Sequence, residues 1–126
     1  MIQPLKLIFS TTKGDNQYVI KMPTVGNFYD IEVNKQVLGK GFYSSVVKTN
    51  TVSAIHAADM IDIEAHLSVL CPELLKDLKA RSFKDLGLED YNEIKKVYIK
   101  EFLPWWQIVT GKHLNELQYQ SYQLHE

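Results

Sequence analysis

The stretch TVSAIHAADMIDIEAHLSVLCPELLKDL, residues 51–78, decides the fold. Up to Leu70 its apolar residues recur at helical spacing on two arcs of the helix surface, so we expect a central helix, from about residue 51 to Leu70, covered on two sides. Thr51 is one of several neighbouring residues able to cap its start. Cys71-Pro72 interrupts the pattern, and Pro72 suits the first turn of a further short helix. One arc holds Val52, Met60, Ile63, Leu67 and Leu70, and the other holds Ala54, Ala58, Ile61, Ala65 and Val69.

Before this stretch, the sequence predicts a β-hairpin and then a helix. Two short apolar segments, Leu5–Phe9 and Tyr18–Met22, flank a glycine-containing loop that is longer than the tightest turns. Two strands alone are marginally stable in water, so the hairpin must pack on something else or pair with another chain. Pro23-Thr24 marks a break, and a helix from Thr24 to Leu38 fits best, with a third strand around Tyr29–Val33 as the alternative.

After this stretch, the spacing of Tyr91, Ile94, Tyr98, Phe102 and Trp105 favours a long helix from Leu88 to about Val109. Proline lacks a backbone donor, so Pro104 should kink or end that helix and start a new helical turn. Beyond Gly111, three leucines repeat at helical spacing and predict a C-terminal docking segment, residues 112–126.

These elements together predict an α+β fold, mainly α, in one domain spanning residues 1–126. A short N-terminal β-hairpin, residues 1–22, packs on a compact helical part, residues 24–111. A chain of 126 residues with 45% hydrophobic and 23% charged residues is typical of one globular domain. Its single cysteine excludes a disulfide scaffold.

The net charge and the hydropathy of the chain limit the classes of molecule that it is expected to bind. A net charge of −1 provides no general attraction to nucleic acid or anionic lipid. The uncharged stretches are too short for a membrane span, and Met1–Ser10 lacks the apolar centre of a secretory signal. We therefore expect an intracellular, soluble chain with no membrane partner and no strong nucleic-acid signal.

The strongest indication of chemistry is a set of acidic and histidine residues on the central helix. Asp59, Asp62 and His66 can share one face, which raises the alternative of a small metal-dependent enzyme. All the candidates lie on one helix and match no established metal-binding spacing, so a solvated polar strip is the preferred interpretation. We expect no catalytic residue, no metal and no cofactor.

Two other features have simple structural interpretations. Gly39 and Gly41 suit the end of a helix, where a left-handed residue is common, better than a phosphate-binding loop. Cys71 lies among leucines and is expected to be a small buried residue rather than a nucleophile.

The adjacent tryptophans suggest a surface for partners. Neighbouring helical positions point about 100° apart, so we expect one of Trp105 and Trp106 in the core and the other available. Because the net charge of the chain is close to zero, we favour contact with a protein. The alternative is a nucleic-acid-binding module, in which Trp106 stacks on bases beside Lys95, Lys96 and Lys100. The predicted protein-binding residues are Trp105, Trp106, Phe102, Leu114, Leu117 and Leu124.

In this order of elements, and in Val69–Leu74 and Glu101–Trp106, the chain resembles the small tail assembly and baseplate-associated proteins of tailed bacteriophages. The resemblance spans roughly Val19 to Gln107 and implies no catalytic residues. It implies a non-enzymatic protein that binds other phage structural or tail proteins, as an assembly chaperone or a particle subunit, with homo-oligomers as a further option. It places the protein in the host cytoplasm, with association to the virion as an alternative.

Overall fold

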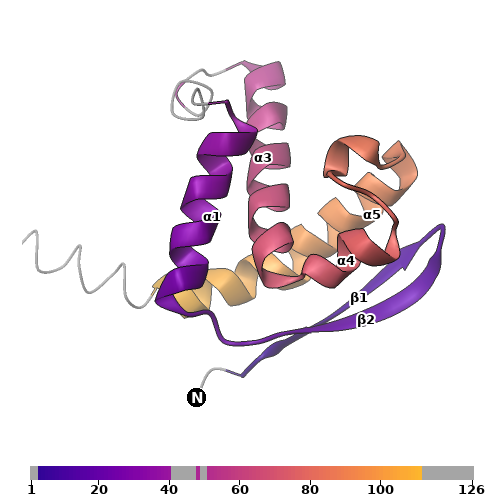
Figure 1. Ribbon diagram of the computed structural model, residues 1–126, viewed down its shortest axis with the longest axis horizontal. Helices are drawn as coiled ribbons and strands as arrows, with labels where there is room; N and C mark the ends of the chain where they lie inside the picture. The colour runs from indigo at the N-terminus through magenta and orange to yellow at the C-terminus, as the bar shows by residue number, and fades with distance from the viewer. Residues whose placement is uncertain (1–2, 41–47, 49–50, 112–126) are drawn as a thin grey trace, which may run out of the picture.

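The computed structural model describes residues 3–40, 48 and 51–111 (Figure 1). It is mainly helical with an N-terminal two-stranded antiparallel hairpin packed on the helical part, which confirms the expected fold class. The alternative of a third strand around Tyr29–Val33 is wrong, because these residues lie inside a helix. The elements are β1 (Leu5–Thr11), β2 (Gly14–Ile20), α1 (Val25–Leu38), α3 (Val52–Leu70), α4 (Pro72–Asp77), a 3₁₀ turn (Phe83–Asp85), α5 (Leu88–Val97) and a π-helical turn (Tyr98–Phe102).

The hairpin is tighter than the sequence predicts. Thr11 pairs with Gly14, so Thr12 and Lys13 alone form the turn, and the strands extend into the residues expected to be loop. Gly14 has a φ of +106°, which a residue without a Cβ adopts at little cost. The expected long loop is therefore wrong, because a contact from a distant helix holds the turn: Asp90 accepts hydrogen bonds from Thr12.

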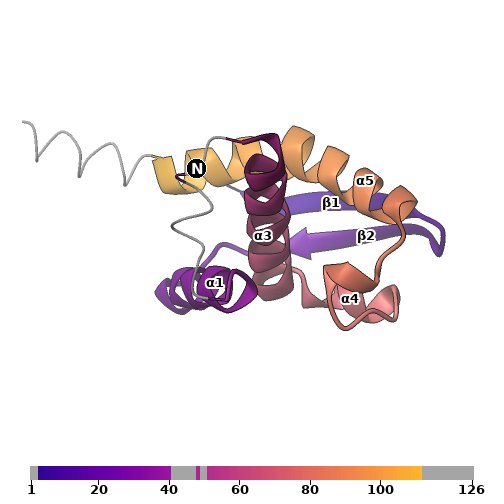
Figure 2. The ribbon, with the colours of Figure 1, turned by 90° about the horizontal axis from the view of Figure 1, so that it is seen from above.

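One face of the hairpin packs on the helices and the other faces outward. Leu7, Phe9 and Ile20 are buried, whereas Ile8 and Val19 on the opposite face are exposed. Seen from above, α5 and the helical residues after it lie along the hairpin, and α5 contacts β1 (Figure 2). This packing supplies the support that two isolated strands lack.

Helices α1 and α3 lie side by side in opposite directions (Figure 1). Thr24 and Thr51 are their N-caps, each accepting a backbone hydrogen bond in the first turn. Only the C-terminal half of α3 is covered as predicted: Ile63 and Leu67 are buried, but Val52 is exposed. The long helix crosses α3 in its C-terminal half, so the described residues leave the first turns of α3 less covered.

The chain stays helical from Leu88 to residue 111 and passes through Pro104 without a break. The expected helix end or new start at Pro104 is therefore wrong. The π-helical turn ends at Phe102, two residues before the proline, and the N–H of Leu103 donates to the carbonyl of Tyr98, five residues earlier. A π-helical turn shifts the hydrogen-bond pattern by one residue, so the helix can continue although the proline has no N–H to donate.

The helix ends differ in detail from the glycine-based prediction. Gly39 caps α1 with a φ of −83°, and the left-handed conformation belongs to Lys40, with a φ of 53°. Gly41 lies outside the described residues. Among the helices that the structure describes, none has the length and apolar character needed to cross a membrane.

Candidate protein-binding surface

Helix α1 has apolar side chains on two opposite faces. Toward α3 it presents Ile31, which is 2% exposed. On the face away from α3 it presents four apolar residues, each four positions after the last and each on the surface. Their exposed fractions are 87% for Val25, 70% for Tyr29, 41% for Val33 and 67% for Val37. We call these four residues the α1 ridge. Helix α1 therefore carries more apolar side chains than its packing on α3 uses.

A groove lies beside the ridge, between α1 and the helical residues 103–111. Its volume is about 760 Å³, and most of its lining is apolar. Phe28 and Trp106 face each other in it, with ring centroids 5.1 Å apart. Val25 belongs to both the ridge and this groove, so the two surfaces are continuous. We call this feature the Trp106 groove.

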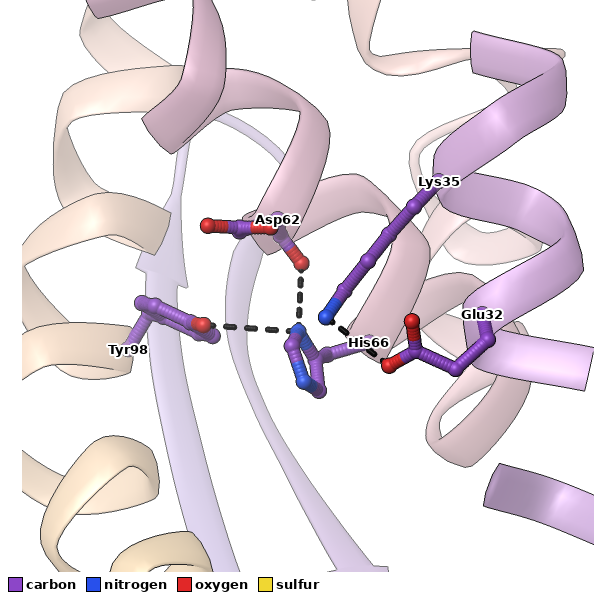
Figure 3. Close-up of polar contacts among 5 residues, drawn as sticks. All are labelled: Glu32, Lys35, Asp62, His66 and Tyr98. Atoms are coloured by element: carbon purple, nitrogen blue, oxygen red, sulfur yellow. Dashed lines mark hydrogen bonds and ion pairs between the residues drawn. The ribbon is translucent and has the colours of Figure 1, made fainter. Parts of the chain in front are cut away.

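His66 of α3 contributes to the groove lining, although only 5% of its surface is exposed. Its Nδ1 lies 2.6 Å from the backbone carbonyl oxygen of Asp62, and the hydroxyl of Tyr98 lies 3.4 Å from the same nitrogen (Figure 3). A carbonyl oxygen only accepts, so Nδ1 carries a proton, and in the neutral ring Nε2 is the acceptor.

Burial lowers the pKa of His66, because removing an imidazolium from water is unfavourable. The hydrogen bond to the Asp62 carbonyl opposes this effect, and the positive charge of Lys35 adds to it. The side chain is therefore a neutral imidazole near neutral pH. Its ring packs edge-on against Trp106 and Phe102, with centroids 5.1 and 5.6 Å away.

Two charged residues of α1 also line the groove. Lys35 Nζ lies 3.1 Å from Glu32 Oε1, and Figure 3 shows both side chains on the opposite side of His66 from Tyr98. The Glu32 side chain is 69% exposed and that of Lys35 is 15% exposed. The paired charges give the groove a polar margin with little net charge.

The two tryptophans are both half-buried, so the expected division into one core residue and one available residue is wrong. Trp105 Nε1 donates to the carbonyl oxygen of Gln3 at 2.8 Å and so ties the start of the chain to the long helix. Trp106 lies in the groove. Phe102, expected in the protein-binding set, is fully buried and stacks under Trp106 at 5.7 Å, so it supports the surface from within.

The remaining predicted residues of this set, Leu114, Leu117 and Leu124, lie outside the described residues. The lysines of the nucleic-acid alternative, Lys95, Lys96 and Lys100, do not line the Trp106 groove.

The acidic and histidine strip of α3 is not the solvated face that was expected. His66 is buried, and its Nδ1 is engaged by the backbone of Asp62, while Asp59 and Asp62 are half-buried. Within residues 3–40, 48 and 51–111, no three His, Cys, Asp or Glu side chains are grouped so that they could hold a metal ion.

Cys71 is buried, as predicted. Burial raises the pKa of its thiol to about 12, so the sulfur is protonated at neutral pH.

The α1 ridge was missed in the sequence. Phe28, Ile31, Lys35 and Leu38 also repeat at helical spacing, so the helix has a second apolar pattern beside the ridge. The signal that could have found the ridge is the repeat of Val25, Tyr29, Val33 and Val37 at intervals of four.

No protein-family model, curated protein or solved structure matches this chain.

Proposed function

We propose that the chain is a non-enzymatic protein that binds another protein through the α1 ridge and the Trp106 groove. The observation that carries the proposal is the ridge itself: four apolar side chains exposed on the face of α1 opposite the one that packs on α3. Contiguous exposed apolar surface is characteristic of interaction sites, and a half-buried tryptophan beside it is a typical anchor residue.

The state of the reactive side chains supports binding over catalysis. His66 has one ring nitrogen engaged by a backbone carbonyl, and its ring is enclosed by Tyr98, Phe102 and Trp106. Cys71 is buried as a thiol, whereas the thiolate is the nucleophilic form. Neither group is arranged as an activated nucleophile or a solvent-accessible base.

The narrower form of the proposal follows from the sequence resemblance. The partners would be other structural or tail proteins of a bacteriophage, and the chain would act in the host cytoplasm as an assembly chaperone or remain in the particle as a subunit. The apolar ridge suits either role, because both need a surface that another protein covers.

Site-specific photo-crosslinking tests the binding surface. A photoreactive phenylalanine analogue replaces Tyr29 on the ridge, and a control carries it at Lys84, an exposed position on the 3₁₀ turn. In cells producing phage particles, we expect a discrete adduct with one phage protein from position 29 and none from position 84. Adding Val33→Asp should abolish the adduct while leaving the helical circular dichroism unchanged, since Val33 is on the surface.

Equal adducts at positions 29 and 84, or none at position 29, would count against the proposal. Probing purified mature particles for the chain then separates the two roles: a subunit stays with the particle, and a chaperone does not.

A further inference from the structure

The Trp106 groove lies where the described chain ends. Val109 and Thr110 line it, so residues 112–126 begin directly at its edge. On the other side, the lining runs along α1 from Val25 to Lys35, a helical distance of roughly 15 Å. A helix of residues 112–126 would be roughly 22 Å long, enough to cover this wall.

The chemistry of the C-terminal segment matches that of the groove. If helical, residues 112–126 would place Leu114, Leu117 and Leu124 within about 80° of one another, which makes a single apolar edge. An amphipathic helix that lays such an edge into an apolar groove is a recurring mode of recognition. The groove offers the apolar surfaces of Phe28, Ile31 and Trp106.

Gly111 stands at the point where the chain would have to reverse. A Cβ built at this residue meets nothing within 4 Å, so the glycine is not required there by close packing. Gly111 is the last helical residue that the structure describes, and glycine is among the weakest helix formers, so a helix ends readily at this position. The residue type and its place just after the groove lining suit a fold-back.

We propose that residues 112–126 fold back at Gly111 and occupy the Trp106 groove of the same chain, so that this segment competes with the partner for the binding surface. The competition rests on the proposed function, whereas the docking does not. A tethered segment has an effective concentration on the order of millimolar, so it can occupy a small site.

Paramagnetic relaxation in the full-length protein tests the docking. A nitroxide is attached at Gln120→Cys, and the buried, protonated Cys71 thiol does not compete for the label. In dilute ¹⁵N-labelled protein, we expect the amide signals of Phe28 and Ile31 to be broadened. A mixture of spin-labelled unenriched chains and ¹⁵N chains without the label should show no broadening, because the contact is within one chain.

Matched substitutions in the segment complete the test. Leu117→Asp should restore the signals of Phe28 and Ile31, because a carboxylate does not enter an apolar groove, whereas Gln118→Asp should leave them broadened. Sharp signals in the singly labelled protein would overturn the proposal, and so would broadening in the mixed sample, which would identify a second copy as the occupant. Photo-crosslinking at Tyr29 reports separately on partner binding, so the docking of residues 112–126 and the binding of a partner can each be refuted without the other.

Discussion

The carboxylate of Asp90, in the first turn of α5, accepts two hydrogen bonds from Thr12 in the turn of the hairpin. One comes from the backbone N–H and the other from the hydroxyl, and each is 2.8 Å long. The two residues are 78 positions apart in the chain. Through this contact, the tip of the hairpin is fastened to the helix on which β1 packs.

Asp90→Ala should lower the free energy of unfolding by about 1–2 kcal/mol, because both hydrogen bonds from Thr12 are lost and their shared acceptor is a carboxylate. Urea denaturation measures the change. Glu89→Ala removes a carboxylate from the same helical turn at an exposed position, and serves as the control. Equal losses in the two variants would show that the helix terminus, rather than the contact with Thr12, is responsible.

The contact with Asp90 also shows why the hairpin could be predicted but its turn could not. The apolar run Leu5–Phe9 and the alternating segment Tyr18–Met22 are local signals, and they located both strands. The tight turn at Thr12 depends on a side chain from a distant helix. The π-helical turn before Pro104 is similar, because local propensity predicts a helix end there, whereas packing of Phe102 and Trp106 on His66 favours continuing the helix.

The candidate surface was predictable only in part. The tryptophan pair was identified from its residue types, but which way each ring points depends on the π-helical turn. The α1 ridge was missed because the helix has two apolar faces, and periodicity alone cannot say which of them a neighbouring helix covers. His66 was expected on a wet face because Asp59 and Asp62 share its side of α3, yet the long helix crosses over it and buries it.

Ile63→Ala should lower the free energy of unfolding by about 2–5 kcal/mol, because Ile63 is 1% exposed and its removal leaves a cavity. Ile55→Ala is the matched control on the same helix, since Ile55 is 47% exposed and its truncation should cost under about 1 kcal/mol. The urea denaturation midpoints of the two variants, compared with that of the parent protein, measure these losses. An unchanged midpoint for Ile63→Ala would contradict the assignment of this residue to the core.

His66 should make the protein less stable in mild acid. Its pKa is lowered in the folded state, so below about pH 6.5 the unfolded chain binds a proton that the folded chain does not. Stability therefore falls as the pH drops from about 6.5 toward the folded pKa, by at most about 1.4 kcal/mol per pH unit.

His66→Gln should remove this part of the pH dependence, although the variant itself is less stable. Urea denaturation at several pH values between 5 and 7.5 gives the slopes to compare. His56→Gln, at an exposed position of α3, is the control for the loss of an imidazole from the same helix. If both variants show the parent slope, His66 is not the responsible group.

Lys79→Gly should stabilise the protein by up to about 1 kcal/mol. Lys79 follows α4 with a φ of 55°, a conformation that is costly for residues with a Cβ and easy for glycine. Two hydrogen bonds close the helix end around it: Lys79 N donates to the carbonyl of Lys76, and Ala80 N to that of Leu75. Lys79→Ala shortens the side chain without relieving the backbone and should give no gain. A higher melting temperature for alanine than for glycine would contradict this explanation.

Trp106→Ala should lower the free energy of unfolding by about 2 kcal/mol or more. The ring contacts Phe28 of α1, His66 of α3 and the buried Phe102, so it joins three elements that are distant in the chain. Large-to-small changes at fully buried aromatic residues cost about 3–5 kcal/mol, and a half-buried ring should cost less. Ile108→Ala, two positions further along the same helix and 60% exposed, should change stability little.

The same variant tests whether the groove contributes to binding. If it does, Trp106→Ala should also weaken association with the crosslinked partner by more than about 1 kcal/mol, measured at a temperature where the variant remains folded. Trp106→Phe keeps an aromatic ring against Phe28 and should retain most of the stability while losing part of the affinity. Loss of stability with unchanged affinity would assign Trp106 to the packing of α1 alone, and would leave the α1 ridge as the whole of the binding surface.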